Sequence, residues 1–280
     1  VGWVHTISSG INQGFLNCFV SFIISYYATD ESSMIVLFTD FGITGPYVGQ
    51  MKSVLCQQAP TIPVIDLMHD APTFDPQAAA YLLASLVSEF PQDSVFLCVV
   101  DPGVGSQRKP LIARINQRWF VGPDNGLFNI VAQRAPGNSE VKWWEISWLP
   151  ERLSSSFHGR DLFAPVAAML ANGEAPPGKL FNITPDRIYH WPGDLEKIIY
   201  IDHFGNAMTG IRAANLDNNH VIAVADLRLR WARTFADVTI GQGFWYENSN
   251  GLVELAVNQG RADEILRLTI GDAVTLVAQN

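Results

Sequence analysis

Acidic residues follow apolar runs at two places in the chain, and both are positions where a carboxylate can meet a ligand. Asp40 comes after the apolar run 35–39 and before Gly42, where a carboxylate can accept both hydroxyls of a ribose. Asp101 ends the run 94–100 and precedes a proline and two glycines, which permit close approach of a ligand to the backbone. Because Asp is also a common turn former, each residue could instead cap a tight loop.

A histidine and further turns add candidates. His158 lies directly before an apolar helical run, and the N-terminus of a helix disfavours the charged imidazolium. A neutral His158 could act as a base or as a hydrogen-bond acceptor, with a buried structural histidine as the alternative. Asp202 ends a β-type run before another glycine turn, whereas Pro123–Gly126 is a turn signature that needs no ligand to explain it.

The same residue types could instead form a metal centre. Carboxylates and imidazoles that could bind a divalent ion occur at Asp40, Asp66, His69, Asp101 and His158. None of them occurs in an H-x-H, H-E-x-x-H or D-x-D pair, which first-row metal sites usually show. We therefore expect no metal at the site, and metal-assisted hydrolysis is the weaker alternative.

Strands and helices that could position these side chains alternate in the first part of the chain. Apolar runs predict strands at 35–39, 63–67 and 94–100 and a helix at 47–57. Asp75 followed by Pro76 marks the N-terminus of a further helix. This alternation predicts a mostly parallel sheet with helices on both faces, in which ligands bind beyond the carboxyl ends of the strands.

The pattern changes after a connection rich in proline and glycine at 171–194. Short β-type runs then follow one another with little helical periodicity. They lie at 198–201, 221–225, 252–257, 265–270 and 273–277. These runs predict a small β-sandwich or barrel after the α/β domain.

We expect three regions along the chain. Residues 1–33 contain no Lys or Arg, and their apolar stretch 15–28 is shorter than a membrane span and lacks the charged start of a secretory signal. They are interpreted as an extension outside the fold, with a signal or anchor, or an added helix, as alternatives. Residues 34–190 are expected to form the α/β domain and residues 195–280 the C-terminal β domain.

Composition argues against several classes of partner. The chain has 18 Lys and Arg against 27 Asp and Glu, a net charge of −9, which disfavours binding to phosphate backbones or anionic lipids. We expect neither nucleic acid nor membrane as a partner. The three cysteines lie in apolar stretches without a C-x-x-C pair, so neither disulfides nor structural zinc are indicated, and a cytoplasmic location is favoured.

Taken together, the motifs resemble those of one family, the S-adenosylmethionine (SAM) hydroxide adenosyltransferases, or SAM hydrolases, which are related to fluorinase and chlorinase. The segments that carry the resemblance are Phe38–Gly42 with Gly45–Gly49, Val100–Gly105, Pro123–Gly126, Ser156–Asp161 and Asp202–Asn206. It extends from Met34 to nearly the C-terminus. It implies an N-terminal mostly parallel α/β domain that binds the nucleoside, a C-terminal β-barrel-like domain, and a homotrimer with active sites between subunits.

The resemblance also implies a reaction. Water or hydroxide attacks the ribose C5′ of SAM, which releases adenosine and L-methionine. Asp101, Arg108 and His158 are similar to the family's Asp-Arg-His set. An ionised Asp101 beside Arg108, together with a neutral His158, could hold and partly deprotonate one water. SAM is then the small-molecule substrate, and no cofactor is expected.

Substrate-binding residues are implied in the same way. Asp40 matches the acceptor of the ribose hydroxyls, and Phe74 matches a ring that stacks on the sugar or adenine. The other implied binding residues are Phe157, Asp202, Phe204, Asn206, Ser249 and Asn250. Asn250 departs from the pattern because the halogenating relatives carry an arginine there, which leaves the contact to the methionine carboxylate undefined.

Two alternatives keep the fold and change the function. A halogenase of the same superfamily would bind a desolvated halide, but the carboxylate of Asp101 would repel an anion. A protein that binds SAM or adenosine without turnover would keep the pocket and lose the residues that position water, whereas this chain retains all three.

Overall fold

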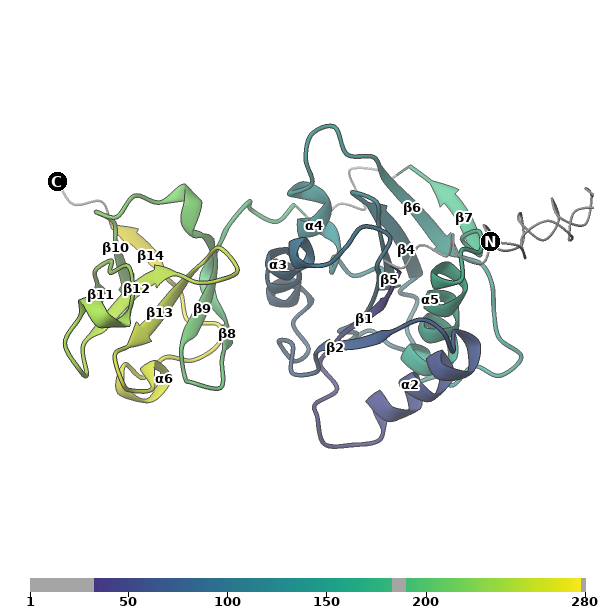
Figure 1. Cartoon of the computed structure of the whole chain (residues 1–280), viewed down its shortest axis with the longest axis horizontal. Coiled ribbons are helices and arrows are strands. Elements are labelled where there is room, and N and C mark those ends of the chain that lie inside the picture. The colour runs from purple at the N-terminus through teal and green to yellow at the C-terminus, as the bar shows by residue number, and fades with distance from the viewer. Residues whose placement is uncertain (1–32, 183–189, 278–280) are drawn as a thin grey trace, which may run out of the picture.

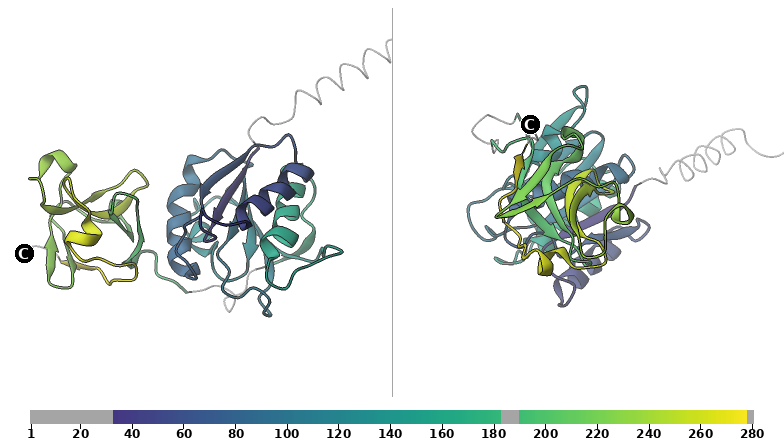
Figure 2. Two further views of the ribbon diagram at one scale, coloured as in Figure 1. Left: turned by 90° about the horizontal axis from the view of Figure 1, so that it is seen from below. Right: turned by 90° about the vertical axis from the view of Figure 1, so that its left-hand side faces the viewer.

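The computed structural model describes residues 33–182 and 190–277, so the extension expected at 1–33 lies outside the described residues except for Ser33. The described chain forms an N-terminal unit (33–182) and a C-terminal unit (190–277). The two units lie side by side and are joined by one connection (Figures 1 and 2).

Strands and helices of the N-terminal unit alternate along the chain. In order they are β1 (Ile35–Thr39), α2 (Tyr47–Gln58), β2 (Val64–Met68), α3 (Pro76–Leu86), β3 (Val95–Val99), β4 (Pro110–Ile115), β5 (Arg118–Pro123), α4 (Asn129–Gln133), β6 (Val141–Ile146), α5 (Ala164–Ala171) and β7 (Gly178–Phe181). A short π-helix (Gly159–Phe163) precedes α5. Helix α3 begins as its sequence predicts, because the Asp75 side chain accepts a hydrogen bond from the backbone N–H of Ala78 at 3.0 Å and Pro76 occupies the first turn.

The strands form one sheet in the order β2-β1-β3-β5-β4-β6-β7. The β1–β2, β1–β3 and β3–β5 pairs are parallel, whereas β4–β5, β4–β6 and β6–β7 are antiparallel. The α/β class is confirmed, but the sheet is mixed rather than mostly parallel. The reason is local: Asn116 and Gln117, at φ of 47° and 64°, close a two-residue hairpin between β4 and β5, and a hairpin joins only antiparallel strands.

Helices cover both faces of this sheet, as the alternation predicted (Figure 1). Val36 and Phe38 of β1 point into a core that contains buried residues of α3 and α4. Ile35 and Leu37 point to the opposite face, where the core contains residues of α2 and α5. Because successive strand residues face opposite sides, β1 is buried on both faces, and its carboxyl end is held firmly at the edge of the two cores.

Antiparallel strands build the C-terminal unit. The elements are β8 (Leu195–Ile201), β9 (Ala207–Arg212), β10 (Val221–Val224), β11 (Leu227–Leu229), β12 (Gly243–Glu247), β13 (Leu252–Val257), α6 (Ala262–Ile265) and β14 (Thr275–Val277). They form a sheet β12-β13-β9-β8 and a sheet β11-β10-β14, which share one hydrophobic core. A closed barrel is not confirmed, since no closed sheet is found among the described strands.

The strand expected at 265–270 is also wrong. Helix α6 ends at Ile265, and a turn follows it. In this stretch Leu268 is buried, whereas Ile265 and Ile270 are about half exposed, so its apolar residues do not share a buried face. The strand signal came from β-branched and apolar residue types, and the α6 turn overrides it.

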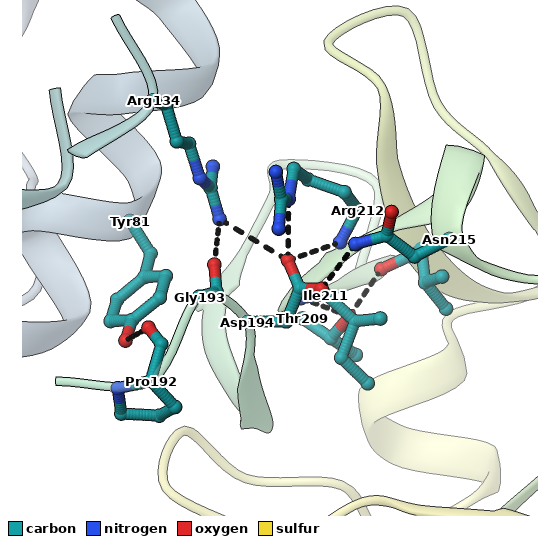
Figure 3. A network of polar contacts seen from close by, with 10 residues as sticks. Tyr81, Arg134, Pro192, Gly193, Asp194, Thr209, Ile211, Arg212 and Asn215 are labelled. Atoms are coloured by element: carbon teal, nitrogen blue, oxygen red, sulfur yellow. Dashed lines mark hydrogen bonds and ion pairs between the residues drawn. The ribbon is translucent and has the colours of Figure 1, made fainter. Parts of the chain in front are cut away.

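The connection between the units is fixed by polar contacts (Figure 3). Arg134, after α4, donates to the carbonyl of Gly193 at 3.1 Å and pairs with Asp194 at 3.5 Å. From the other unit, Arg212 donates to the same Asp194 carboxylate at 2.7 Å. Tyr81 of α3 donates to the Pro192 carbonyl, and burial raises the pKa of its hydroxyl to about 12. We call this set the linker clamp; it joins α3 and α4 to the first strands of the C-terminal unit.

Candidate active site

Asp101 lies just beyond the carboxyl end of β3, in the centre of the sheet. The loop that follows folds tightly, with the N–H of Val104 donating to the Asp101 carbonyl at 3.2 Å. On its other side, the amide of Asn125 donates to the carbonyl of Val100 at 2.8 Å. The turn 123–126, for which the sequence required no function, thus fixes the strand end that carries Asp101.

Arg108 joins Asp101 to His158. Its Nε donates to Asp101 Oδ1 at 3.0 Å, and its Nη2 donates to Oδ2, so the guanidinium grips the carboxylate with two parallel hydrogen bonds. The same Nη2 lies 3.1 Å from Nδ1 of His158. The Asp101 and Arg108 side chains are only 4% and 7% exposed, so the pair is shielded from bulk water. The structure therefore brings together the three residues that the sequence singled out.

The contact with Arg108 sets the tautomer of His158. A guanidinium can only donate, so Nδ1 of His158 must be the acceptor and the neutral ring carries its hydrogen on Nε2. Burial and the adjacent Arg108 charge both lower the pKa of His158, which favours this neutral form. His158 directly precedes the π-helix, in place of the ordinary α-helix N-terminus that the sequence predicted.

Gly105 allows the 101–108 loop to approach the segment that carries His158. Its φ is +78°, and a Cβ at this position would lie 2.7 Å from the backbone oxygen of Ser155. A side chain here would push the 101–108 loop away from the segment that carries His158. The glycine is therefore needed for contact between Arg108 and His158.

Asp40 holds a second loop beside this cluster. Its Oδ2 accepts a hydrogen bond from the backbone N–H of Phe74 at 3.1 Å, and Phe74 adopts a φ of 58°, which is unusual for an aromatic residue. Burial raises the pKa of the Asp40 carboxyl, with a smaller increase from the nearby Asp101 charge. Phe74 is 75% exposed, so much of this aromatic residue is open to a partner.

Aromatic rings form one wall of the cavity into which these groups open. Phe157 packs edge-on against Phe41 and Tyr47, with ring centroids 5.8 and 5.3 Å away, and the Arg160 guanidinium lies 5.0 Å from its ring. The cavity has a volume of about 360 Å³. Its lining includes Asp40, Phe74, Asp101, Phe157 and His158. We call it the N-terminal cavity; Tyr47, Thr73 and Ser156 also line it and had not been singled out individually.

Four of the other predicted residues line a separate and larger cavity in the C-terminal unit. This C-terminal cavity has a volume of about 820 Å³, and its lining includes Asp202, Phe204, Asn206 and Ser249. Asp202 accepts hydrogen bonds from the backbone N–H of Asn206 at 2.8 Å and from its amide at 3.3 Å. The Phe204 ring is 72% exposed, like that of Phe74.

A buried acid in the C-terminal cavity was missed by sequence reasoning. Glu254 of β13 is 2% exposed, accepts a hydrogen bond from the Tyr246 hydroxyl, and accepts another from the amide of Asn248 at 2.7 Å. Burial raises the pKa of its carboxyl. In sequence, Glu254 occupies a buried strand as a single charged residue, a signal that could have found it.

Asn250 lies apart from both groups. It lines a third cavity of about 400 Å³ with Asp66, His69, Asp70 and Tyr200, which come from the two units. Its backbone N–H donates to the side chain of Asn248 at 3.0 Å. The residues that line the N-terminal and C-terminal cavities have no member in common, so the binding residues expected from sequence, apart from Asn250, line two separate cavities in one chain.

The five residues of the metal alternative do not converge. Asp101 and His158 both contact Arg108, whose positive charge already occupies the space between them. Asp66 instead pairs with Lys52 at 2.9 Å. Within residues 33–182 and 190–277, no group of three or more His, Cys, Asp or Glu side chains is arranged to hold a metal ion.

Family comparisons agree with the fold and with these motifs. The model of the SAM hydroxide adenosyltransferase N-terminal domain matches residues 35–180, and that of the C-terminal domain matches residues 196–275. The chain belongs to the SAM hydroxide adenosyltransferase family.

Individual relatives extend this result. An (R)-S-adenosyl-L-methionine hydrolase of Thermus thermophilus is 37% identical over 253 residues, which cover 85% of this chain and 97% of that protein. A fluorinase of Actinopolyspora mzabensis is 25% identical over 270 residues, which cover 80% of this chain and 90% of that protein. The crystal structure of an uncharacterised conserved protein of Thermotoga maritima is similar with a TM-score of 0.78 and 30% identity, over 87% of this chain and all of that one.

Proposed function

We propose that this protein hydrolyses S-adenosyl-L-methionine to adenosine and L-methionine. The observation that carries the proposal is the Asp101–Arg108–His158 cluster, which opens into the same cavity as Asp40. Four relatives at 34–38% identity bear the name of (R)-S-adenosyl-L-methionine hydrolase, which supports the same activity and the R configuration at sulfur.

The reaction is a displacement at the ribose C5′. An oxygen of water forms a bond to C5′, the C5′–S bond breaks, and its electron pair neutralises the sulfonium to give the thioether of methionine. Because the leaving group departs neutral, it needs no general acid. The protein must hold the water in line with the C5′–S bond and exclude competing solvent.

Asp101 and His158 have different roles toward this water. Nδ1 of His158 is already used by Arg108, so the ring offers Nε2–H as a donor to the water oxygen. Asp101 lines the cavity as a carboxylate and is the group that can accept a water proton. Arg108 positions both. We thus assign proton acceptance to Asp101, and His158 orients the nucleophile.

A complete site would form between two copies of the chain. The half-site with Asp40, Phe74 and Phe157 would hold the nucleoside, and the half-site with Asp202 would hold the methionine part. In support, Phe74 and Phe204 expose most of their rings on different cavities. We propose the homotrimer that the family resemblance implies. Mixing Asp101→Ala with Asp202→Ala protein should restore activity if each active site combines two copies, and no recovery would contradict this.

The test of the activity is product analysis in ¹⁸O-labelled water. We expect adenosine that carries one ¹⁸O at its 5′-hydroxyl, together with unlabelled L-methionine. The displacement needs no cofactor, so a chelator should not abolish turnover. Loss of activity with chelator and its recovery with a divalent ion would overturn the proposed mechanism.

The remaining alternatives give different outcomes in the same assay. A halogenase would form 5′-halo-adenosine when fluoride or chloride is added, and 25% identity to fluorinases makes this control necessary. A protein without turnover would bind SAM and leave it intact. Asp101 opposes the first alternative by charge, and retention of the Arg108 contacts opposes the second.

The cytoplasmic location is also a proposal. Cys56 and Cys98 are free thiols in the structure, which fits a reducing compartment. In the part of the chain that the structure describes, no helix combines the length and apolar character needed to cross a bilayer.

A further inference from the structure

His69 is a buried histidine that the proposed reaction does not use. It is only 6% exposed and follows β2 directly, beside the turn that carries Asp40 after β1. Burying an imidazole is costly unless its nitrogens have partners, so its contacts indicate what it does there.

A hydrogen bond joins His69 to Thr39. Thr39 Oγ1 lies 2.8 Å from Nδ1 of His69, and the backbone N–H of Phe41 donates to the same hydroxyl oxygen at 3.4 Å. Because that N–H can only donate, the hydroxyl hydrogen of Thr39 is free to point at Nδ1. Thr39 is fully buried, so water does not compete. With this direction of the bond, the ring hydrogen of His69 lies on Nε2, which faces Asp66.

Charged residues complete this arrangement. Nε2 of His69 lies 3.2 Å from Oδ1 of Asp66, and Lys52 pairs with the other oxygen of Asp66 at 2.9 Å. The Nε2 contact is not aligned as a hydrogen bond, so it acts as attraction between an N–H dipole and a carboxylate. The Asp66 and Lys52 side chains are 44% and 37% exposed, so solvent weakens their contribution. The firm contact is the one to Thr39.

The same two strand ends are also joined through their backbones. The N–H of Gly42 donates to the His69 carbonyl at 2.6 Å, and the N–H of Ala71 donates to the Thr39 carbonyl at 3.1 Å. One residue beyond Thr39, the Asp40 carboxylate accepts from Phe74. His69 thus lies where the two segments that carry Asp40 and Phe74 leave the sheet.

We propose that His69 is a positioning residue that fixes the Asp40 turn for ribose binding through its hydrogen bond to Thr39. The inference rests on the proposed function, because ribose binding by Asp40 is part of that function. It assigns affinity for the nucleoside, and not the rate of the displacement, to this buried contact.

The test compares two ways of breaking the contact with one that keeps it. Thr39→Val removes the hydroxyl at nearly constant shape, and His69→Gln places its amide at the Nε2 position, away from Thr39. Each should weaken adenosine binding, measured by calorimetry, and raise KM for SAM about tenfold, the size of one buried hydrogen bond, with kcat changed less than about threefold. Combining them should add little.

Matched controls define the expected pattern. His69→Asn keeps an acceptor at the Nδ1 position and should restore most of the affinity. His220→Gln alters a histidine that pairs with Asp217 in the C-terminal unit, outside both cavities, and should leave binding unchanged. If Thr39→Val binds adenosine as tightly as the parent, or if it lowers kcat and leaves KM unchanged, the positioning role is wrong.

A readout without ligand separates this proposal from the proposed function. In ¹⁵N spectra, His69 of the unaltered protein should show the Nε2–H tautomer, and Thr39→Val should speed hydrogen exchange of the Gly42 and Phe74 amides. An Nδ1–H tautomer, or unchanged exchange in Thr39→Val, overturns the positioning role. A parent protein that passes both tests yet leaves SAM intact overturns the proposed function and keeps the positioning role.

Discussion

The two cavities that contain most of the expected site residues differ in how their polar groups are held. In the N-terminal cavity of about 360 Å³, charged groups bond to one another, with Asp101 and Arg108 almost fully buried. In the C-terminal cavity of about 820 Å³, the acids Asp202 and Glu254 have neutral partners, and Phe204 is largely exposed. In the first cavity the polar groups are held by one another before a ligand arrives, whereas the second cavity is larger and has a largely exposed aromatic residue in its lining. Under the proposed function, the chemistry would depend on the N-terminal cavity and recognition on both.

The largest effect is expected for Asp101→Asn. The substitution removes the proton acceptor at nearly constant shape, and the single-turnover rate with bound SAM should fall about 10²-fold or more. The dissociation constant of SAM should change far less. Adding His158→Ala should reduce the rate by much less than the product of the single effects, because both act on one water. A rate close to that of the parent would move the chemistry away from the N-terminal cavity.

A smaller effect is expected for Asp40→Asn. The ribose hydroxyls would lose a charged acceptor, which is worth about 1.5–3 kcal/mol, so the dissociation constant of adenosine should rise about 10- to 100-fold. Asp93→Asn is the matched control, since Asp93 pairs with Arg114 on the surface and lines neither cavity. Asp40→Asn protein that binds adenosine normally but hydrolyses SAM slowly would place Asp40 in the chemical step.

The pH profile should show a more gradual effect. The proposed mechanism needs a neutral His158, and burial together with Arg108 lowers the pKa of His158. As the pH falls, kcat should therefore still be unchanged at about pH 6.5, the ordinary pKa of a histidine, and should decline only at lower pH. The unfolded chain takes up this proton first, so stability should fall as pH drops from about 6.5 towards the folded pKa. In Arg108→Gln, the pKa of His158 followed by NMR should rise, because a positive neighbour is lost. An unchanged value would contradict the assigned contact.

The smallest effect is expected in the C-terminal cavity. Phe204→Ala removes one exposed ring and should raise KM for SAM about three- to tenfold, with kcat nearly unchanged. Ile240→Ala provides the control, because Ile240 is 71% exposed in the same unit and does not line the cavity. A loss of kcat without a change in KM would show that this half-site also contributes to the chemical step.

Sequence was most informative where one local signal agreed with burial. The runs at 35–39 and 252–257 are strands with those bounds, and Asp75 caps α3 as its neighbours indicated. The motifs around Asp101, Arg108 and His158 meet in one place. Each of these motifs lies near the end of a strand or helix, and such ends can be located from short sequence motifs.

Long-range pairing was harder to predict. The antiparallel half of the sheet depends on the hairpin at Asn116 and Gln117, which lack the glycine that usually marks such a turn. The contact of Asn125 with Val100 joins segments that are distant in sequence. No local pattern encodes these contacts, because tertiary packing brings the partners together.

In the linker clamp, the carboxylate of Asp194 contacts both units of the chain. Burial alone would raise the pKa of Asp194, but hydrogen bonds from Arg212 and Asn215 lower it, so this anchor keeps its charge in ordinary conditions. Asp194 lines neither cavity, yet it pairs with Arg134 of the N-terminal unit and with Arg212 of the C-terminal unit (Figure 3). A substitution of Asp194 would release Arg134 and Arg212 and loosen the connection between the units, while leaving Asp101, Arg108 and His158 in place.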